Sequence, residues 1–359
     1  MKTILAALEF PPALGGVERY YGNIEKYWPD ELIVVDNRNK ELINPRLPFL
    51  KWLPALATLR KAIRGVRPDW LIIGEILPLG TVAWILSHFM TFKYAVFLHG
   101  LDFSLAIRSN WKKNLSIKIL KRSSKIICVN SKTASIVTNV LGDDSKIHIA
   151  HPGVDPVAPS IRLERVSGLR ANYGLENSFV LITIARLVPR KGFEQVLSVL
   201  PALLENYPQL RYVIIGRGPE EVHLKELIND PSLLGKVFLL TDVTDDEKWT
   251  WLDLSDAFVM PTYEKNGDYE GFGIVYLEAN LAGKPVIAAA SGGVADAVID
   301  GINGLLIKEN DSEGLFEAIR KLVEDPDLAV QLGQKGKERV LKDFCWPDAI
   351  KRVHSILRT

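Results

Sequence analysis

Cysteine is scarce in this chain of 359 residues, which contains only Cys128 and Cys345. Two cysteines are too few for a disulfide framework, so we expect a reducing compartment. Long apolar runs are also absent: the longest, residues 76–87, contains a proline and falls short of the roughly 20 residues that a membrane-spanning helix needs. Residues 1–10 are typical of a buried strand rather than a leader peptide. We therefore expect a protein that does not span a membrane.

No residue type dominates the composition. Hydrophobic residues make up 47% of the chain and charged residues 24%, which is typical of soluble globular proteins and excludes disorder, collagen and coiled coils. At about 150 residues per domain, the length predicts two domains.

The formal net charge of +1 conceals two halves of opposite sign. Residues 1–155 contain 21 Lys and Arg against 13 Asp and Glu, whereas the remainder contains 23 against 30. Two tracts without acidic residues, 42–68 and 103–142, hold six and eight of these basic residues. They favour an anionic partner, either a phosphorylated acceptor or a membrane surface, although solvated helix faces would have the same composition.

Short apolar runs alternate with amphipathic stretches along the chain, which predicts right-handed crossovers and parallel sheets covered on both faces. The expected strands are 3–8, 32–35, 70–73, 94–98, 125–129, 146–150, 179–185, 212–216, 237–240, 257–260, 285–289 and 304–307. The expected helices include 17–28, 54–64, 110–121, 133–141 and, near the end of the chain, 346–357.

A proline-rich stretch from residue 151 to residue 173 interrupts the alternation and has the composition of a linker. We expect a first domain at 1–155, a linker at 156–175, a second domain at 176–343 and a final helical segment at 344–359. Ligands of doubly wound sheets bind outside the carboxyl ends of the strands. The expected site is therefore the cleft between the two domains.

Two motifs in the first half follow expected strands. Gly15 and Gly16 open a helix, where backbone N–H groups favour a phosphate, although a plain turn would use the same residues. The spaced third glycine of a dinucleotide fingerprint is missing, which argues against a nicotinamide-dependent dehydrogenase. His99 and Asp102 follow the buried run 94–98. A histidine at that strand end faces the cleft, and a purely structural histidine is the alternative.

Basic residues and glycines follow two strands of the second half. Arg186 and Lys191 lie in one strand-to-helix loop and could clamp a diphosphate, the first by its fork and the second as a point charge. Gly216 and Gly218 follow the next strand and permit close approach of the backbone to a nucleotide. A solvated basic loop and an ordinary Gly-x-Gly turn are the alternatives.

The strongest pattern is the stretch 270–279, Glu-Gly-Phe-Gly-Ile-Val-Tyr-Leu-Glu-Ala. Its glycines place backbone N–H groups at a helix start, where they can bind phosphate. Glu270 and Glu278 are about two helical turns apart and can reach one ligand from the same side. The apolar neighbours of Glu278 predict a hydroxyl or a cation beside it, because a buried carboxylate without a partner is costly. A structural salt bridge is the alternative.

Together these residues resemble the retaining glycosyltransferases of family 4, which have the GT-B fold, and they are similar to the mannosyltransferase-like subgroup. The resemblance covers nearly the whole chain. The matching motifs, in family order, are Gly15-Gly16, His99-Gly100-x-Asp102, His151-Pro152-Gly153-Val154-Asp155, Arg186 with Lys191-Gly192, Gly216-x-Gly218-Pro219, Glu270-x7-Glu278, Ser291-Gly292-Gly293 and Gly301-x-Asn303-Gly304.

The resemblance implies an α/β fold of two doubly wound, Rossmann-like domains facing across a cleft, with the last helix returning to the first domain. The first domain would bind the acceptor and the second the nucleotide-sugar donor. The implied reaction moves a hexose, with retention, from GDP-mannose as first choice or a UDP-sugar as second, to a glycan or lipid-linked acceptor.

The resemblance also implies roles for individual residues. His99 and Glu270 would be catalytic, with Glu270 and the 272–274 backbone holding the donor sugar and phosphate. The donor-binding residues would be Gly16, Asp102, Arg186, Lys191, Gly216, Gly218, Val243, Phe272, Gly273, Ile274 and Glu278. Within this set Arg186 and Lys191 would bind the diphosphate, Glu278 the ribose, Val243 the base, and Gly16 the phosphates from the other domain.

We expect no cofactor and no metal. The only Asp-x-Asp, Asp325-Pro326-Asp327, has the pattern of a helix start. The expected partners are the nucleotide-sugar, the acceptor and an anionic membrane surface, without nucleic acid, in a cytoplasmic location peripheral to the inner face of the membrane. The loop Tyr263–Tyr269 is longer and more polar than a minimal family loop, which indicates a role in donor choice or cleft closure.

Two other functions fit parts of the pattern. A non-hydrolysing sugar-nucleotide epimerase shares the architecture but would need further carboxylates and histidines in the cleft. A non-catalytic sugar-nucleotide-binding module would have lost His99, Lys191 or Glu270, all of which are present.

Overall fold

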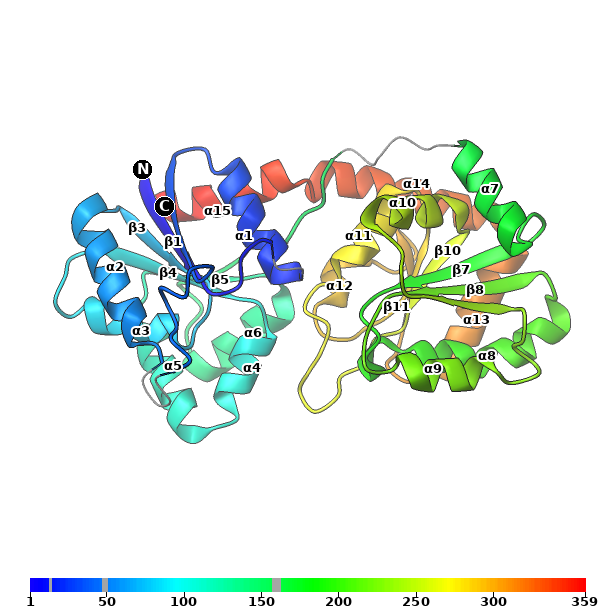
Figure 1. Ribbon diagram of the computed structural model, residues 1–359, viewed down its shortest axis with the longest axis horizontal. Helices are drawn as coiled ribbons and strands as arrows, with labels where there is room; N and C mark the ends of the chain where they lie inside the picture. Colours follow the sequence, from blue (N-terminus) through cyan, green and yellow to red (C-terminus); the bar gives the residue numbers. More distant parts are fainter. Residues whose placement is uncertain (13–14, 47–50, 157–162) are drawn as a thin grey trace. The chain divides into compact units, whose positions relative to one another are not determined.

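The computed structural model describes residues 1–12, 15–46, 51–156 and 163–359 (Figure 1). The chain forms two compact units. Unit 1 consists of Met1–Gly153 together with Trp346–Thr359, and unit 2 consists of Val154–Cys345.

Unit 1 contains a parallel six-stranded sheet in the order β2-β1-β3-β4-β5-β6. Because β1 lies between β2 and β3, the chain changes its winding direction at β1 and β3, and such switch points are where doubly wound sheets bind ligands. The strands are β1 (Lys2–Ala7), β2 (Glu31–Asp36), β3 (Trp70–Ile73), β4 (Lys93–Leu98), β5 (Lys125–Cys128) and β6 (Ile147–Ile149). The helices are α1 (Gly16–Tyr27), α2 (Leu53–Val66), α3 (Leu79–Leu86), α4 (Leu101–Ile107), α5 (Asn110–Arg122), α6 (Ser131–Leu141) and α15 (Trp346–Arg358).

The last helix, α15, packs against α1, as Figure 1 shows for the red and blue ends of the chain. The Trp346 ring meets the edge of Tyr20 at a centroid distance of 5.3 Å, and His354 hydrogen-bonds Asp30 at 2.7 Å. The apolar face of α15, including Ile350 and Val353, is fully buried. The predicted return of the final helix to the first domain is confirmed.

Unit 2 contains a second parallel sheet in the order β12-β11-β10-β7-β8-β9, with its switch point between β7 and β10. The strands are β7 (Phe179–Ile184), β8 (Leu210–Ile215), β9 (Val237–Leu240), β10 (Ala257–Met260), β11 (Val286–Ala289) and β12 (Gly304–Ile307). The helices are α7 (Leu163–Tyr173), η1 (Pro189–Lys191), α8 (Phe193–Asn206), α9 (Glu221–Ile228), α10 (Asp245–Leu254), α11 (Ile274–Leu281), α12 (Val294–Ala297), α13 (Ser312–Glu324) and α14 (Pro326–Asp343). The predicted pair of doubly wound sheets is confirmed.

The stretch 156–175, which we expected to be a linker, contains helix α7. This helix is part of unit 2: Arg170 donates a hydrogen bond of 2.7 Å to the Leu254 carbonyl, and the Tyr173 ring lies 5.1 Å from that of Trp251. The sequence did not predict this helix, because residues 162–170 are rich in charge and lack a long apolar stripe. Hydrogen bonds and the Tyr173 ring provide much of its attachment to unit 2.

Asp325 caps α14, as the sequence predicts, because its carboxylate accepts a hydrogen bond of 2.9 Å from the Leu328 N–H. Among the described residues no helix combines the length and the apolar character needed to cross a bilayer.

Candidate active site

The carboxyl ends of β7 and β10, at the switch point of unit 2, carry a cluster of opposite charges. Lys191 ends the short turn η1 after β7, and its buried ammonium pairs with the carboxylate of Glu270, which follows β10. Arg190 also donates to Glu270 Oε2, at 3.0 Å, and pairs with Asp268 at 3.1 Å. The sequence predicted Lys191 and Glu270 as site residues but missed Arg190, whose only signal was its position beside Lys191.

Glu270 is ionised at neutral pH. Burial alone would raise the pKa of its carboxyl, but the Lys191 and Arg190 cations outweigh burial and hold that pKa below its ordinary value of 4.5. The negatively charged carboxylate of Glu270 therefore accepts hydrogen bonds from two cations, Lys191 and Arg190.

Arg186, the other basic residue predicted in this loop, is exposed. Its guanidinium makes no hydrogen bond or ion pair within the described part of the chain. Unlike Lys191, it has no ion-pair partner among the described residues. A planar guanidinium can bind an incoming phosphate through two donors.

The predicted glycines of unit 2 bring loops into close backbone contact. A Cβ at Gly216 would lie 1.9 Å from the Ala185 carbonyl oxygen, and one at Gly218 would lie 2.3 Å from the Leu187 carbonyl oxygen. The loops after β7 and β8 therefore pack directly on each other. Loop packing alone accounts for both glycines, and nucleotide contact remains an expectation.

Helix α11 begins directly after Gly273, which has a φ of +79° that other residues rarely adopt. The preceding Phe272 is buried, with its ring 5.8 Å from that of Phe344, and Ile274 is the first helical residue. The Glu270 carbonyl accepts a hydrogen bond of 2.9 Å from the Gly293 N–H. The backbone on both sides of Glu270 is therefore fixed.

Glu278, on α11, is buried and accepts a hydrogen bond of 2.9 Å from Lys248 on α10. The sequence predicts a cation or a hydroxyl beside this carboxylate, and the cation is Lys248, which sequence reasoning missed. The expected contact of Glu278 with a ribose stays a prediction, because the Lys248–Glu278 salt bridge does not test it.

The partly buried Val243 lies in the loop between β9 and α10.

In unit 1, His99 and Asp102 lie at the carboxyl end of β4. Asp102 Oδ1 accepts hydrogen bonds from the backbone N–H groups of His99 (3.1 Å) and Gly100 (2.9 Å). Burial lowers the pKa of His99 to about 4, so its imidazole is neutral at neutral pH. Burial also raises the pKa of Asp102 to about 6, although backbone hydrogen bonds oppose that rise.

Glu75 lies just beyond β3, beside the switch point of unit 1, and sequence reasoning missed it. Its Oε1 accepts hydrogen bonds from the N–H groups of Leu8 (2.9 Å) and Glu9 (3.3 Å). Its Oε2 is buried and has no hydrogen-bond partner among the described residues. Burial raises the pKa of this carboxyl to about 8.

Gly16, at the start of α1, is exposed, and a Cβ there would meet no atom within 4 Å.

A metal ion could find three ligand atoms at one place in unit 2. Glu194, Glu220 and His223 offer atoms within 4.8 Å of one another, and His223 Nε2 lies 3.0 Å from Glu194 Oε1. Two of the three residues are exposed, and exposed acidic residues often cluster without a metal. None of these three residues forms an ion pair with Lys191 or Glu270 among the described residues.

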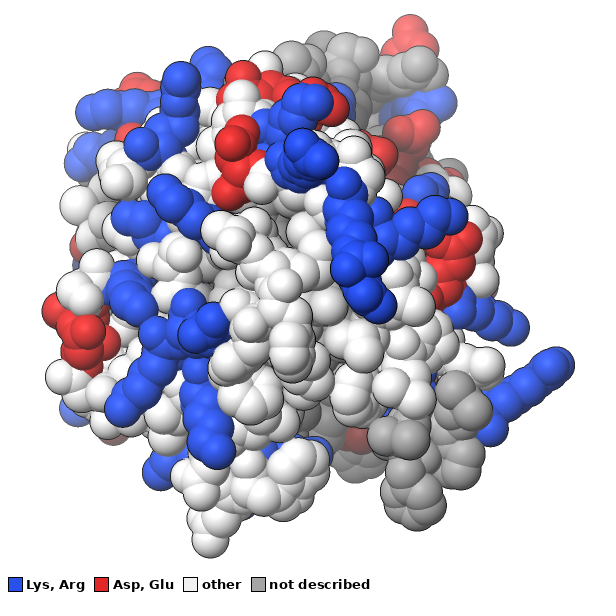
Figure 2. All heavy atoms as spheres, turned by 90° about the vertical axis from the view of Figure 1, so that its left-hand side faces the viewer, with Lys and Arg blue, Asp and Glu red and all other residues white. Residues whose placement is uncertain are grey.

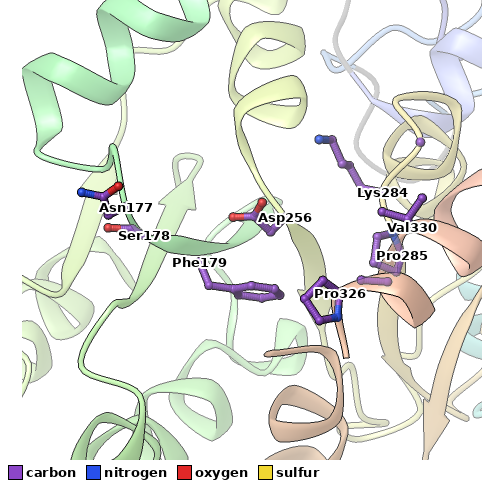
Figure 3. Close-up of a pocket in the computed structure, with 10 residues that line it drawn as sticks. Asn177, Ser178, Phe179, Asp256, Lys284, Pro285, Pro326 and Val330 are labelled. Carbon is purple, nitrogen blue, oxygen red and sulfur yellow. The ribbon is translucent and has the colours of Figure 1, made fainter. Parts of the chain in front are cut away.

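A pocket of about 410 Å³ lies at the opposite edge of the unit 2 sheet (Figure 3). Phe179, Asp256 and Pro285 line it at the amino ends of β7, β10 and β11, and Pro326 lines it from the start of α14. Because Arg186 and Glu270 follow the carboxyl ends of their strands, this pocket is not the candidate active site.

Two doubly wound sheets, with a last helix that returns to the first unit, define the GT-B class of folds. Residues 14–157 match the family described as Glycosyltransferase Family 4, and residues 169–339 match the Glycosyl transferases group 1. The chain belongs to family 4 of the glycosyltransferases.

Two curated mannosyltransferases are similar to this chain. A GDP-mannose-dependent alpha-(1-6)-phosphatidylinositol monomannoside mannosyltransferase of Mycolicibacterium smegmatis is 30% identical over 231 residues, which cover 64% of this chain and 60% of that protein. The match thus spans less than two thirds of that relative. A second relative is a GDP-mannose-dependent monoacylated alpha-(1-6)-phosphatidylinositol monomannoside mannosyltransferase of Corynebacterium glutamicum. It is 27% identical, and the match covers 100% of this chain and 98% of that protein.

Solved structures share the fold at low sequence identity. Anabaena HepE in complex with UDP has a TM-score of 0.81 and 21% identity, covering 100% of both chains. WaaG, a glycosyltransferase involved in lipopolysaccharide biosynthesis, has a TM-score of 0.73 and 16% identity, covering 99% of both chains.

Proposed function

We propose that this protein is a retaining glycosyltransferase that binds a nucleotide-sugar through unit 2 and transfers the hexose to a lipid-linked or glycan acceptor. The observation that carries the proposal is the charge cluster at the β7–β10 switch point, where Arg186 is unpaired within the described residues and Lys191 is held by Glu270. GDP-mannose is the first choice of donor, because the two mannosyltransferase relatives described above are named as GDP-mannose-dependent. A UDP-sugar is the second choice.

The reaction breaks the bond between the anomeric carbon and the diphosphate oxygen and forms a bond from that carbon to an acceptor oxygen. The acceptor proton leaves with the nucleoside diphosphate. Negative charge develops on the diphosphate, and preorganised cations that meet it there lower the barrier. Arg186 and Lys191 would supply these cations, which is the task that a metal ion performs in other enzymes.

Glu270 would serve two purposes in this reaction. Its ion pairs hold Lys191 and Arg190 in place before the donor binds. Once the diphosphate shares those cations, the carboxylate can accept hydrogen bonds from the donor sugar. Glu278, paired with Lys248, would bind the ribose.

His99 would contact the sugar from unit 1. Because burial lowers its pKa to about 4, the imidazole is neutral at neutral pH, so it would act through a hydrogen bond rather than a positive charge. Asp102 fixes its backbone by accepting hydrogen bonds from His99 and Gly100.

The acceptor would be reached at an anionic membrane surface. Figure 2 presents a face of the molecule on which basic side chains outnumber acidic ones. Helix α5 carries Lys112, Lys113, Lys118 and Lys121 together with Trp111, which is 64% exposed. Exposed lysines beside an interfacial tryptophan suit surface binding without insertion of a span.

The other basic tract supports this role less well. The apolar side of α2, including Leu59 and Ile63, is buried in the core, and Trp52 packs against the same core. Phe49 and Leu50, two further apolar residues of this tract, lie outside the described residues. We therefore assign membrane contact to α5 and propose a cytoplasmic, peripheral location.

Donor binding can be tested by measuring the melting temperature with GDP, UDP, GDP-mannose and UDP-glucose. A ligand that binds only the native state raises the melting temperature, by an amount that corresponds to about 2.7 kcal/mol at 100 times its Kd. We expect a rise with GDP and GDP-mannose that the Arg186→Ala variant loses. No response to any of the four compounds would contradict the proposal.

Membrane binding can be tested by co-sedimentation with phosphatidylglycerol vesicles. We expect binding that weakens with salt, because exposed charges are screened, and that the Trp111→Ala variant weakens. Phe89→Ala is the matched control, since Phe89 is 82% exposed but lies outside both basic tracts. Protein that stays in the supernatant at low salt would indicate a soluble acceptor.

A further inference from the structure

Tyr21, on α1, is a fully buried residue that sequence reasoning did not single out. Its ring meets the edges of Phe97 and His99 at centroid distances of 6.1 and 5.3 Å. A Cβ added at Gly74 would lie 2.9 Å from the Tyr21 hydroxyl oxygen, so this hydroxyl has little freedom to move.

The Tyr21 hydroxyl has two partners, the Gly74 carbonyl oxygen and His99 Nε2, the latter at 2.7 Å. A phenol has one proton to donate, and a carbonyl oxygen can only accept. The Tyr21 hydroxyl therefore donates its hydrogen bond to the Gly74 carbonyl oxygen. The hydroxyl oxygen must then accept a hydrogen bond from His99 Nε2–H, which places the hydrogen of the neutral imidazole on Nε2.

The other ring nitrogen, Nδ1, consequently carries a lone pair. Within the described part of the chain, Tyr21 is the only group that hydrogen-bonds the His99 ring. The backbone of His99 is fixed separately, by Asp102. The acidic groups around Tyr21 are Glu9, Glu75 and Asp102, none of which bonds the imidazole.

We propose that Tyr21 is a positioning residue that fixes His99 in the Nε2–H tautomer, so that Nδ1 accepts a hydrogen bond from a hydroxyl of the bound sugar. The tautomer follows from the hydrogen bonds of unit 1 alone. The role of Nδ1 in turnover rests on the proposed transferase function. A ligand that presents hydroxyl donors fits this nitrogen, whereas the oxygens of a fully ionised phosphate, which can only accept, do not.

The neighbouring residue provides a matched control. Tyr20 is also buried, its ring lies 5.8 Å from that of His99, and its hydroxyl donates to the Ala150 carbonyl at 3.1 Å. Tyr20→Phe and Tyr21→Phe each remove one buried hydroxyl, but only Tyr21→Phe removes the acceptor for His99 Nε2–H. A merely structural role would make the two variants behave alike.

The tautomer is read from the ring ¹⁵N signals of histidine-labelled protein, with the His99→Gln variant identifying the signals. We expect a protonated, hydrogen-bonded Nε2 and an unprotonated Nδ1 in the wild type and in Tyr20→Phe, and a changed pattern in Tyr21→Phe. A proton on Nδ1 in the wild type would overturn the proposal, whether or not the protein transfers sugar.

The second measurement is turnover of the nucleotide-sugar that stabilises the protein best. We expect Tyr21→Phe to lower kcat by roughly tenfold, the effect of losing one hydrogen bond in the transition state, and Tyr20→Phe to leave kcat near that of the wild type. An equal kcat in both variants, with the expected ¹⁵N pattern, would overturn the role of His99 Nδ1. Absence of turnover in the wild type would instead contradict the proposed function.

Discussion

Lys191 and Arg186 lie in the same loop, but the structure predicts different consequences for their loss. We expect Lys191→Ala and Arg186→Ala each to lower turnover by roughly 100-fold, because each would remove a preorganised cation that meets the diphosphate, an effect of about 3 kcal/mol. Stability should distinguish them. Lys191 is buried against Glu270, whereas Arg186 is exposed and makes no ion pair within the described ranges.

The size of the stability difference follows from the partners that remain. Removing one member of a buried ion pair typically costs about 3–5 kcal/mol, because the other charge stays buried. In Lys191→Ala, Arg190 still holds Glu270 at 3.0 Å, so we expect a smaller cost of about 2–3 kcal/mol. For a domain of 150–250 residues, that corresponds to a fall in melting temperature of about 4–12 °C. Arg186→Ala should change stability by less than about 0.5 kcal/mol, as exposed substitutions do.

The assay combines the melting temperature, from calorimetry, with turnover at saturating donor. Measuring turnover well below the melting temperature of the less stable variant separates chemistry from unfolding. Equal melting temperatures for both variants would refute the ion-pair argument. Full turnover in Arg186→Ala would refute the assignment of that guanidinium to the diphosphate, whatever the stability result.

Three further predictions concern other charged groups. The pKa of Glu75 is raised to about 8 in the folded protein, whereas the unfolded chain loses that proton near pH 4.5, so the free energy of unfolding should fall by about 1.4 kcal/mol for each pH unit between these two values. Glu75→Gln should therefore flatten the change in melting temperature between pH 6 and pH 8. An unchanged profile would contradict the burial argument. Glu278→Gln should weaken binding of the free nucleoside diphosphate measured by calorimetry, whereas Glu270→Gln should chiefly lower turnover, and equal losses of both properties would contradict this division. Turnover should survive EDTA, because cationic side chains meet the leaving group, and a loss that magnesium or manganese restores would refute the metal-free mechanism.

The sheets could be predicted from the sequence because each strand is a short apolar run bounded by polar or turn residues. Runs such as 70–73 and 257–260 coincide with β3 and β10 residue for residue. Burial on both faces of a parallel sheet produces this signal directly. The helix at 163–173 was missed because the chain around it is rich in charge and proline.

Side-chain partners could not be predicted in the same way. Lys248 and Glu278 are separated by 30 residues, and nothing local indicates that α10 and α11 bring them together. Tyr21 reaches Gly74 because β1 and β3 are neighbours in the sheet. A strand order of this kind depends on packing between distant segments, which the periodicity of one segment does not report.

The ion pairs around Glu270 also bear on how the donor binds. Lys191 and Arg190 both have Glu270 as an ion-pair partner, so a diphosphate that binds these cations must compete with that carboxylate. Such competition weakens binding of the free nucleoside diphosphate. A nucleotide-sugar, in contrast, brings hydroxyl donors that satisfy the carboxylate as the phosphate takes over its cations. We therefore expect Glu270→Gln, which removes the competing charge, to tighten binding of the free nucleoside diphosphate relative to that of the nucleotide-sugar. Titration calorimetry with both ligands measures this ratio of affinities. An unchanged ratio would show that Glu270 holds the cations but accepts no hydrogen bond from the sugar.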